Sequence, residues 1–224
     1  MKTHTELAAS PAVRNSETVL LQSDSPHANY YHFLNRWIIE GSLDEVSAVL
    51  SDPSVTTEWW GSAHSASEVI EAGESDGRHR VIRFLAHGWL PYSLQYLFRV
   101  SETDSCHGFI MEAAGDFRGT AECRVHQEDA GHVSLDFIWM VEVAHPLIRH
   151  FSFLLRPLFA SNHFWVMRRG REGLQLEVRR RRGETALPGF PRAAFPHSLN
   201  QRRGNPRWKP WTASWEEALR HNGK

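Results

Sequence analysis

The stretch from Ser161 to Arg180 is the sequence feature that most constrains the fold. Its pattern predicts a helix that lies very close to another part of the structure or to a ligand. The residues that share one face at helical spacing are His163, Met167, Gly170, Leu174 and Glu177. Gly170 and Gly173 lie inside this pattern, and each costs roughly 1 kcal/mol relative to alanine in a helix. Two arrangements explain such glycines: close packing against a sheet, which is the commoner cause, or a ligand held between sheet and helix.

Upstream of this helix, apolar and polar residues alternate in a series of segments that read as β-strands. They are expected at residues 30–40, 66–72, 78–86, 92–101, 109–114, 120–127 and 132–143. The more apolar face of each strand is expected to point inward, which favours Tyr96, Phe98, Phe137 and Trp139 as inward residues. Short polar turns between successive strands predict an antiparallel meander.

Helical segments are expected between the first two strands and after the last strand. Ser42 and Glu45 have the spacing of a capping box and start a short helix, and residues 56–60 form a further helical turn. A longer helical segment begins at residue 146. Pro157 is expected to kink or split it into two limbs, with Ser161 or Asn162 as the N-cap of the second limb.

Composition excludes several classes of protein. The chain has 224 residues and a formal net charge of -1, so charge gives no argument for nucleic-acid binding. The chain begins without an apolar segment and contains no run of 18 apolar residues, so neither a signal peptide nor a membrane span is expected. Cys106 and Cys123 lack the spacing of metal ligands and indicate a reduced, cytoplasmic setting. The fourteen histidines are scattered, and no metal or cofactor motif is present.

The expected domain organisation has three parts. Residues 1–28 are expected to be a flexible leader, residues 29–182 one folded domain, and residues 183–224 a mostly disordered tail rich in Arg, Pro and Trp. One short helix within residues 211–219 and a contact of the tail with a membrane surface or a protein are both compatible with this composition. Residues 179–182 are all arginine; they complement a helix dipole, which is a simpler explanation than contact with an anionic surface.

The order of elements predicts an α+β helix-grip fold, in which a curved antiparallel sheet of about six to seven strands wraps around a long C-terminal helix. At this point the chain resembles the START-like superfamily, in particular its polyketide cyclase/dehydrase and lipid-transport-like group (SRPBCC). The resemblance covers residues 30–180, roughly two thirds of the chain. The segments that carry it are residues 33–52, Trp59-Trp60, Gly88-Trp89-Leu90-Pro91-Tyr92, residues 115–119, and residues 162–167 with Gly170 and Leu174.

The cavity between sheet and helix is the natural ligand site in such a fold. The residues expected to bind ligand there are Trp59, Trp60, Tyr96, Trp139, Met167 and Gly170, with ordinary core packing as the alternative for the tryptophans. The candidate catalytic residues are Asp116 and His163. Asp116, at an interruption between two strands, would either move protons from an apolar cavity or accept backbone N–H bonds in a turn. His163 would act as a base or hydrogen-bond donor, or be a core histidine.

The resemblance implies a fold more firmly than a reaction, because helix-grip proteins include both carriers and cyclases. The sequence therefore predicts a protein that binds a hydrophobic small molecule, polyketide-like or lipid, without a cofactor. Cyclisation or dehydration of a bound polyketide-like chain is the enzymatic form of this prediction. A non-catalytic carrier or sensor is the alternative, and an accessory protein that uses its tail to bind a partner is a third hypothesis.

Overall fold

The computed structural model describes residues 17–21, 29–104, 107–144, 146–194 and 207–221. Its strands are β1 (Glu17–Leu21), β2 (Tyr30–Glu40), β3 (His64–Glu71), β4 (Val81–His87), β5 (Ser93–Asp104), β6 (Gly108–Gly115), β7 (Phe117–Asp129) and β8 (His132–Val143). The α-helices are α1 (Leu43–Leu50), α2 (Thr56–Trp59), α3 (Pro146–Arg181) and α5 (Trp215–Arg220), with short 3-10 helices at Pro53–Val55 and Pro210–Thr212. This order confirms the predicted α+β helix-grip fold.

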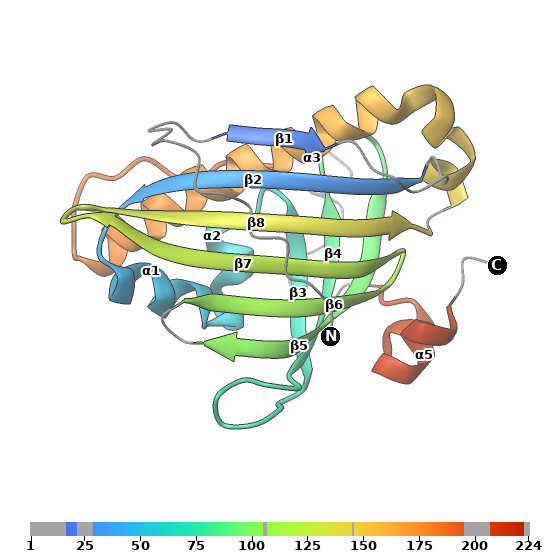
Figure 1. The fold of residues 1–224 in the computed structure, drawn as a ribbon, viewed down its shortest axis with the longest axis horizontal. Helices are drawn as coiled ribbons and strands as arrows, with labels where there is room; N and C mark the ends of the chain where they lie inside the picture. The colour runs from blue at the N-terminus through green and yellow to red at the C-terminus, as the bar shows by residue number, and fades with distance from the viewer. Residues whose placement is uncertain (1–16, 22–28, 105–106, 145, 195–206, 222–224) are drawn as a thin grey trace, which may run out of the picture.

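The eight strands form one antiparallel sheet in the order β1-β2-β8-β7-β6-β5-β4-β3. Figure 1 shows this sheet curving, with α3 running behind it along β2. The strand count exceeds the six to seven expected. The additional strand is β1, which lies in the range predicted to be a flexible leader and pairs with β2. The rest of the predicted leader lies outside the described residues, and so does Cys106.

Burial along β2 alternates as the sequence predicts. Tyr31, Phe33, Trp37 and Ile39 are buried on the concave face, whereas their neighbours are partly exposed. Phe33 of β2 lies opposite Trp139 of β8, and Trp37 lies opposite Leu135. Aromatic and aliphatic side chains from the two adjacent strands therefore meet on this face. The predicted inward residues Tyr96, Phe98, Phe137 and Trp139 all pack in the core clusters of the same face.

The capping box at the start of α1 is confirmed. The Glu45 backbone N–H donates to Ser42 Oγ (3.3 Å), and the Ser42 backbone N–H donates to Glu45 Oε2 (2.8 Å). Arg182, at the end of α3, donates from Nε to the same carboxylate at 2.6 Å. The contact explains how a local cap becomes a tertiary link, because the Glu45 side chain serves both helices.

Of the two effects expected of Pro157, a kink or a split of the last helix, the split does not occur. The structure has one helix from Pro146 to Arg181 with Pro157 inside it, and Figure 1 shows its first turns bent relative to the rest. Proline removes one backbone hydrogen bond, but the next turn buries Phe159 and Ala160 against the sheet, which holds the chain in the helix. Neither Ser161 nor Asn162 is therefore an N-cap.

The four arginines at the end of α3 all have carboxylate partners. Arg180 and Arg181 both bond Glu177, whose side chain is fully buried, and Arg179 pairs with Glu184 at 2.7 Å. Arg182 pairs with Glu45. Burial raises the pKa of Glu177, but the hydrogen bonds from Arg180 and Arg181 outweigh it and lower the pKa overall. The basic run therefore serves the packing of the helix end.

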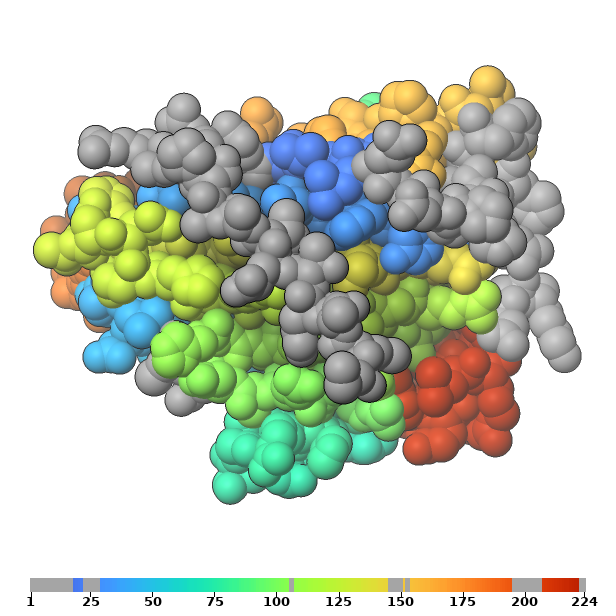
Figure 2. Space-filling model, in the orientation of Figure 1, coloured from blue at the N-terminus to red at the C-terminus, as the bar shows by residue number. Residues whose placement is uncertain are grey.

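Part of the tail is folded against the outer face of the sheet. Trp215 and Ala218 of α5 are buried in a cluster with Val81, Leu97 and Ala114. Leu97 is the neighbour of Tyr96 and points to the opposite face of β5, so α5 covers the face away from α3. Figure 2 shows this C-terminal segment lying against the strands at the lower right. The predicted short helix in this region is confirmed at Trp215–Arg220, whereas the boundaries of leader, domain and tail stay predictions.

In the part of the chain that the structure describes, none of the helices is long and apolar enough to cross a membrane.

Candidate functional site

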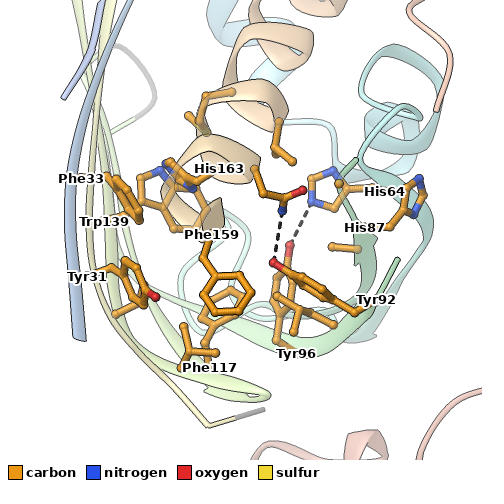
Figure 3. Close-up of a pocket in the computed structure, with 18 of the residues that line it drawn as sticks. Tyr31, Phe33, His64, His87, Tyr92, Tyr96, Phe117, Trp139, Phe159 and His163 are labelled. Carbon is orange, nitrogen blue, oxygen red and sulfur yellow. Dashed lines mark hydrogen bonds between the residues drawn. The ribbon is translucent and has the colours of Figure 1, made fainter. Parts of the chain in front are cut away.

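A cavity of about 140 Å³ lies between the concave face of the sheet and α3. Its aromatic lining comprises Tyr31, Phe33, Trp60, Tyr92, Tyr96, Phe117, Trp139 and Phe159. The aliphatic lining comprises Ala86, Leu94, Val141, Val143, Val166 and Met167, and the remaining residues are His64, His87, Gly88, Asn162 and His163. Figure 3 shows side chains from the sheet and from α3 converging on this space.

A buried histidine–tyrosine pair lies at one side of the cavity. His64 Nε2 and the Tyr96 hydroxyl are 2.9 Å apart, and both residues are buried. Burial lowers the pKa of His64 from 6.5 to about 3, with a further contribution from His87, so the ring is neutral at pH 7. Burial also raises the pKa of Tyr96, so the hydroxyl keeps its proton. The pair thus offers hydrogen bonds without charge, and Figure 3 shows the contact between the two side chains as a dashed line.

The loop after β4 is held against α3 by one amide side chain. Asn162 Oδ1 accepts hydrogen bonds from the backbone N–H groups of Trp89 (2.9 Å) and Leu90 (3.1 Å), and its Nδ2 donates to the Tyr92 hydroxyl (3.3 Å). Gly88 permits this contact, because a Cβ there would lie 2.1 Å from Asn162 Oδ1. The Gly88–Tyr92 segment and Asn162 therefore form one side of the cavity together.

His163 is the predicted catalytic residue that lines the cavity. Its ring stacks on Phe33, with centroids 3.9 Å apart and an interplanar angle of 13°, and meets Trp139 edge-on at 5.9 Å. Its Nε2 atom is buried and has no hydrogen-bond partner among the described residues. Burial lowers the pKa of His163 from 6.5 to about 3, so the ring is neutral and a weak base.

The two glycines of α3 accommodate the Trp59-Trp60 pair. A Cβ on Gly170 would lie 2.5 Å from the Trp60 ring, and a Cβ on Gly173 would lie 1.8 Å from the Trp59 carbonyl oxygen. The Trp60 indole N–H donates to the Val166 carbonyl of α3 at 3.0 Å, and the two indoles stack at 5.2 Å. The close approach that the glycines predict is therefore packing against α2 and its flanking tryptophan.

Five of the eight predicted site residues border the cavity. They are Trp60, Tyr96, Trp139, His163 and Met167. Trp59 and Gly170 lie behind Trp60, outside the lining. Sequence reasoning did not find His64, His87, Asn162 and Phe159 as site residues. His64 and Tyr96 lie on strands β3 and β5, which are separated by β4, so only the strand register brings them together.

Asp116 lies outside the cavity lining and faces the tail. Its carboxylate accepts a hydrogen bond from the Gln95 backbone N–H at 2.7 Å and pairs with Lys209 Nζ at 3.1 Å. The side chain is buried, and Gly115 beside it has φ +119° and packs against Trp211. These contacts are those of the predicted turn alternative, extended by a lysine that comes from the tail.

No group of three or more His, Cys, Asp or Glu side chains with the arrangement of a metal site occurs in the described ranges. Cys123 is a free, buried thiol in the core, and burial raises its pKa well above the ordinary value. The chemistry available at the cavity is therefore apolar contact, ring stacking and neutral hydrogen bonding.

Comparisons with known proteins show likeness at the level of structure. No protein-family model and no curated sequence matches the chain. The protein TTHA0849 from Thermus thermophilus is 17% identical, with a TM-score of 0.51 over 65% of this chain and 94% of that one. A STAR-related lipid transfer protein fragment from Xanthomonas axonopodis is 14% identical, with a TM-score of 0.49 over 74% and 97%.

The Zhui aromatase/cyclase from Streptomyces sp. R1128 is 18% identical, with a TM-score of 0.49 over 70% of this chain and 98% of that one. At such identities a structural match establishes a fold, and the site has to establish the function. The chain therefore has the helix-grip fold that its resemblance to START-like proteins predicts.

Proposed function

We propose that the protein binds a small hydrophobic molecule in the cavity between the sheet and α3, as a carrier or sensor. The observation that carries this proposal is the lining, in which fourteen of nineteen residues are aromatic or aliphatic, counting tyrosine as aromatic. Apolar cavities of about 150 Å³ stay dry and bind ligands such as benzene. A cavity of about 140 Å³ therefore has room for one ring without rearrangement.

Carriage explains this site better than proton-transfer catalysis does. Asp116, one of the two predicted catalytic residues, is engaged by Gln95 and Lys209 outside the lining. His163 borders the cavity, but its pKa of about 3 makes it a poor acceptor of protons at neutral pH. Cyclisation or dehydration would thus depend on folding a substrate in the cavity, with little help from a base.

The first test is native mass spectrometry of the purified protein, followed by denaturation and identification of any released molecule. A companion test measures binding of toluene to the protein by calorimetry. Replacing Val166, which lines the cavity on α3, by Trp should fill the space and abolish toluene binding. Replacing the exposed Arg168 of the same helix by Trp adds the same ring outside the cavity and should leave binding unchanged.

Toluene binding that survives Val166→Trp in a folded protein would show that the molecule binds elsewhere. The enzymatic alternative has a separate readout in the His163→Gln variant. A carrier keeps its ligand affinity in that variant within a few-fold, whereas a cyclase that uses His163 binds its substrate and loses turnover.

A further inference from the structure

The charge of the cavity lining narrows the class of molecule that fits. The residues that line it, all in the described part of the chain, include no Asp, Glu, Lys or Arg. Its polar members are tyrosines, histidines and Asn162. His64 and His163 are neutral at physiological pH because burial lowers the pKa of each ring to about 3. His64 and His163 thus present hydrogen-bonding groups without a formal charge.

We infer that the cavity selects an uncharged molecule of about one ring, with an oxygen such as a ketone or hydroxyl held by Tyr96. This inference rests on the proposed function and specifies the ligand for the same site. Size sets the first limit, because about 140 Å³ is close to the volume of cavities that hold benzene. Polycyclic molecules would require the aromatic lining to move.

Charge sets the second limit. A carboxylate that enters this space loses its hydration shell and finds no Lys or Arg among the lining residues, so its transfer from water is strongly unfavourable. Arg156 is the cation to consider, since its guanidinium lies 4.8 Å from the centroid of the Tyr31 ring. Its Nη1 donates to the Tyr30 carbonyl at 2.8 Å, so the group is already engaged by the backbone of β2.

The Tyr96 hydroxyl is suited to hold a ligand oxygen. A phenolic hydroxyl both donates and accepts a hydrogen bond, and the 2.9 Å contact with His64 Nε2 uses one of these functions. Neutral His64 can carry its proton on either ring nitrogen, so Tyr96 can donate to a ketone or accept from an alcohol. The second pair, Tyr92 and Asn162, is already committed to the loop after β4.

Three molecules of nearly the same shape separate these effects: α-methylstyrene is apolar, acetophenone carries a neutral ketone, and benzoate carries a charge. Calorimetric titration of the full chain at pH 7 should show binding of the first two and binding of benzoate at least a hundredfold weaker than that of acetophenone. In Tyr96→Phe, acetophenone should bind about five- to tenfold more weakly, while α-methylstyrene should bind as it does to the unmodified protein.

Each contrary result has a distinct meaning. Benzoate that binds as tightly as acetophenone overturns the inference and leaves the proposed function standing. Loss of that benzoate binding in Arg156→Gln would then identify Arg156 as the counter-ion. Equal affinity of acetophenone for the Tyr96→Phe variant and the unmodified protein overturns the role of Tyr96. Absence of binding for all three molecules to the folded chain overturns the proposed function itself, and the inference with it.

Discussion

At the scale of single residues, the glycines of α3 determine how close the Trp59-Trp60 segment comes to the helix. Gly173 faces backbone, the Trp59 carbonyl oxygen, whereas Gly170 faces two indole rings, those of Trp37 and Trp60. A ring can shift slightly, but a carbonyl in a packed segment has less freedom. The two glycines therefore tolerate substitution to different degrees, although their spacing in the sequence gives no sign of it.

Gly173→Ala should lower the free energy of unfolding, although alanine is the better helix former. The added Cβ would lie 1.8 Å from the Trp59 carbonyl oxygen, and the resulting displacement should cost about 2 kcal/mol or more net of helix propensity. Urea denaturation measures the change. Gly189→Ala, where a Cβ meets nothing within 4 Å, is the control. Equal stability of both variants would show that α2 adjusts freely.

The buried histidines predict how stability depends on pH. His64 and His163 have folded-state pKa values of about 3, below the unfolded value of 6.5, so the unfolded chain binds more protons between these limits. Stability is therefore complete above pH 6.5 and should fall as pH drops towards 3, by up to about 1.4 kcal/mol per pH unit for each histidine.

Urea denaturation between pH 7 and 5 tests this dependence, because carboxylates titrate little there. His163→Gln should make the decrease shallower, and His126→Gln, at an exposed place on β7, controls for loss of a histidine elsewhere. A decrease of the same size in His163→Gln and the unmodified chain would contradict a neutral, buried ring at this place.

At the scale of elements, alternation along the strands and the capping box of α1 were predictable because each depends on neighbours in sequence. The link between the start of α1 and the end of α3, and the packing of the tail, were not. Glu45 meets Arg182, and Asp116 meets Lys209, across 137 and 93 residues. The folded tail packs through two buried side chains, Trp215 and Ala218, and through single cation–ring contacts such as Arg99 over Trp215 at 4.6 Å. The helix α5 has 6 residues, which is too short for a periodic pattern that would predict how the tail packs.

Trp215→Ala should destabilise the domain, because Trp215 is 2% exposed and covers Val81 and Leu97 on the outer face. Truncating a buried tryptophan costs about 3–5 kcal/mol. Thermal and urea denaturation measure the effect, and Trp208→Ala, at a half-buried place in the same segment, is the control. A domain that keeps its full stability without the Trp215 ring would show that α5 is an appendage with no share in the core.

At the scale of the whole molecule, the sequence predicts the helix-grip fold but only part of the set of residues that line its cavity. Four of the five predicted residues that border the cavity lie on β5, β8 or α3, where alternation and helical spacing indicate the inward face: Tyr96, Trp139, His163 and Met167. The neutral polar pairs escaped prediction because His64 reaches Tyr96 only through the register of β3, β4 and β5. Asn162 escaped because a helix start was expected where the structure has a helix interior.

Trp60 and Trp139 both border the cavity, and they are two of nine tryptophans in the chain. Trp60 is also stacked on Trp59 at 5.2 Å and meets Trp37 at 5.6 Å, so the three indoles form one contiguous group. The molecule thus contains its own optical reporter. A ligand that binds beside Trp60 changes the surroundings of an indole in this group and therefore its emission, and cavity occupancy can be followed in unlabelled protein.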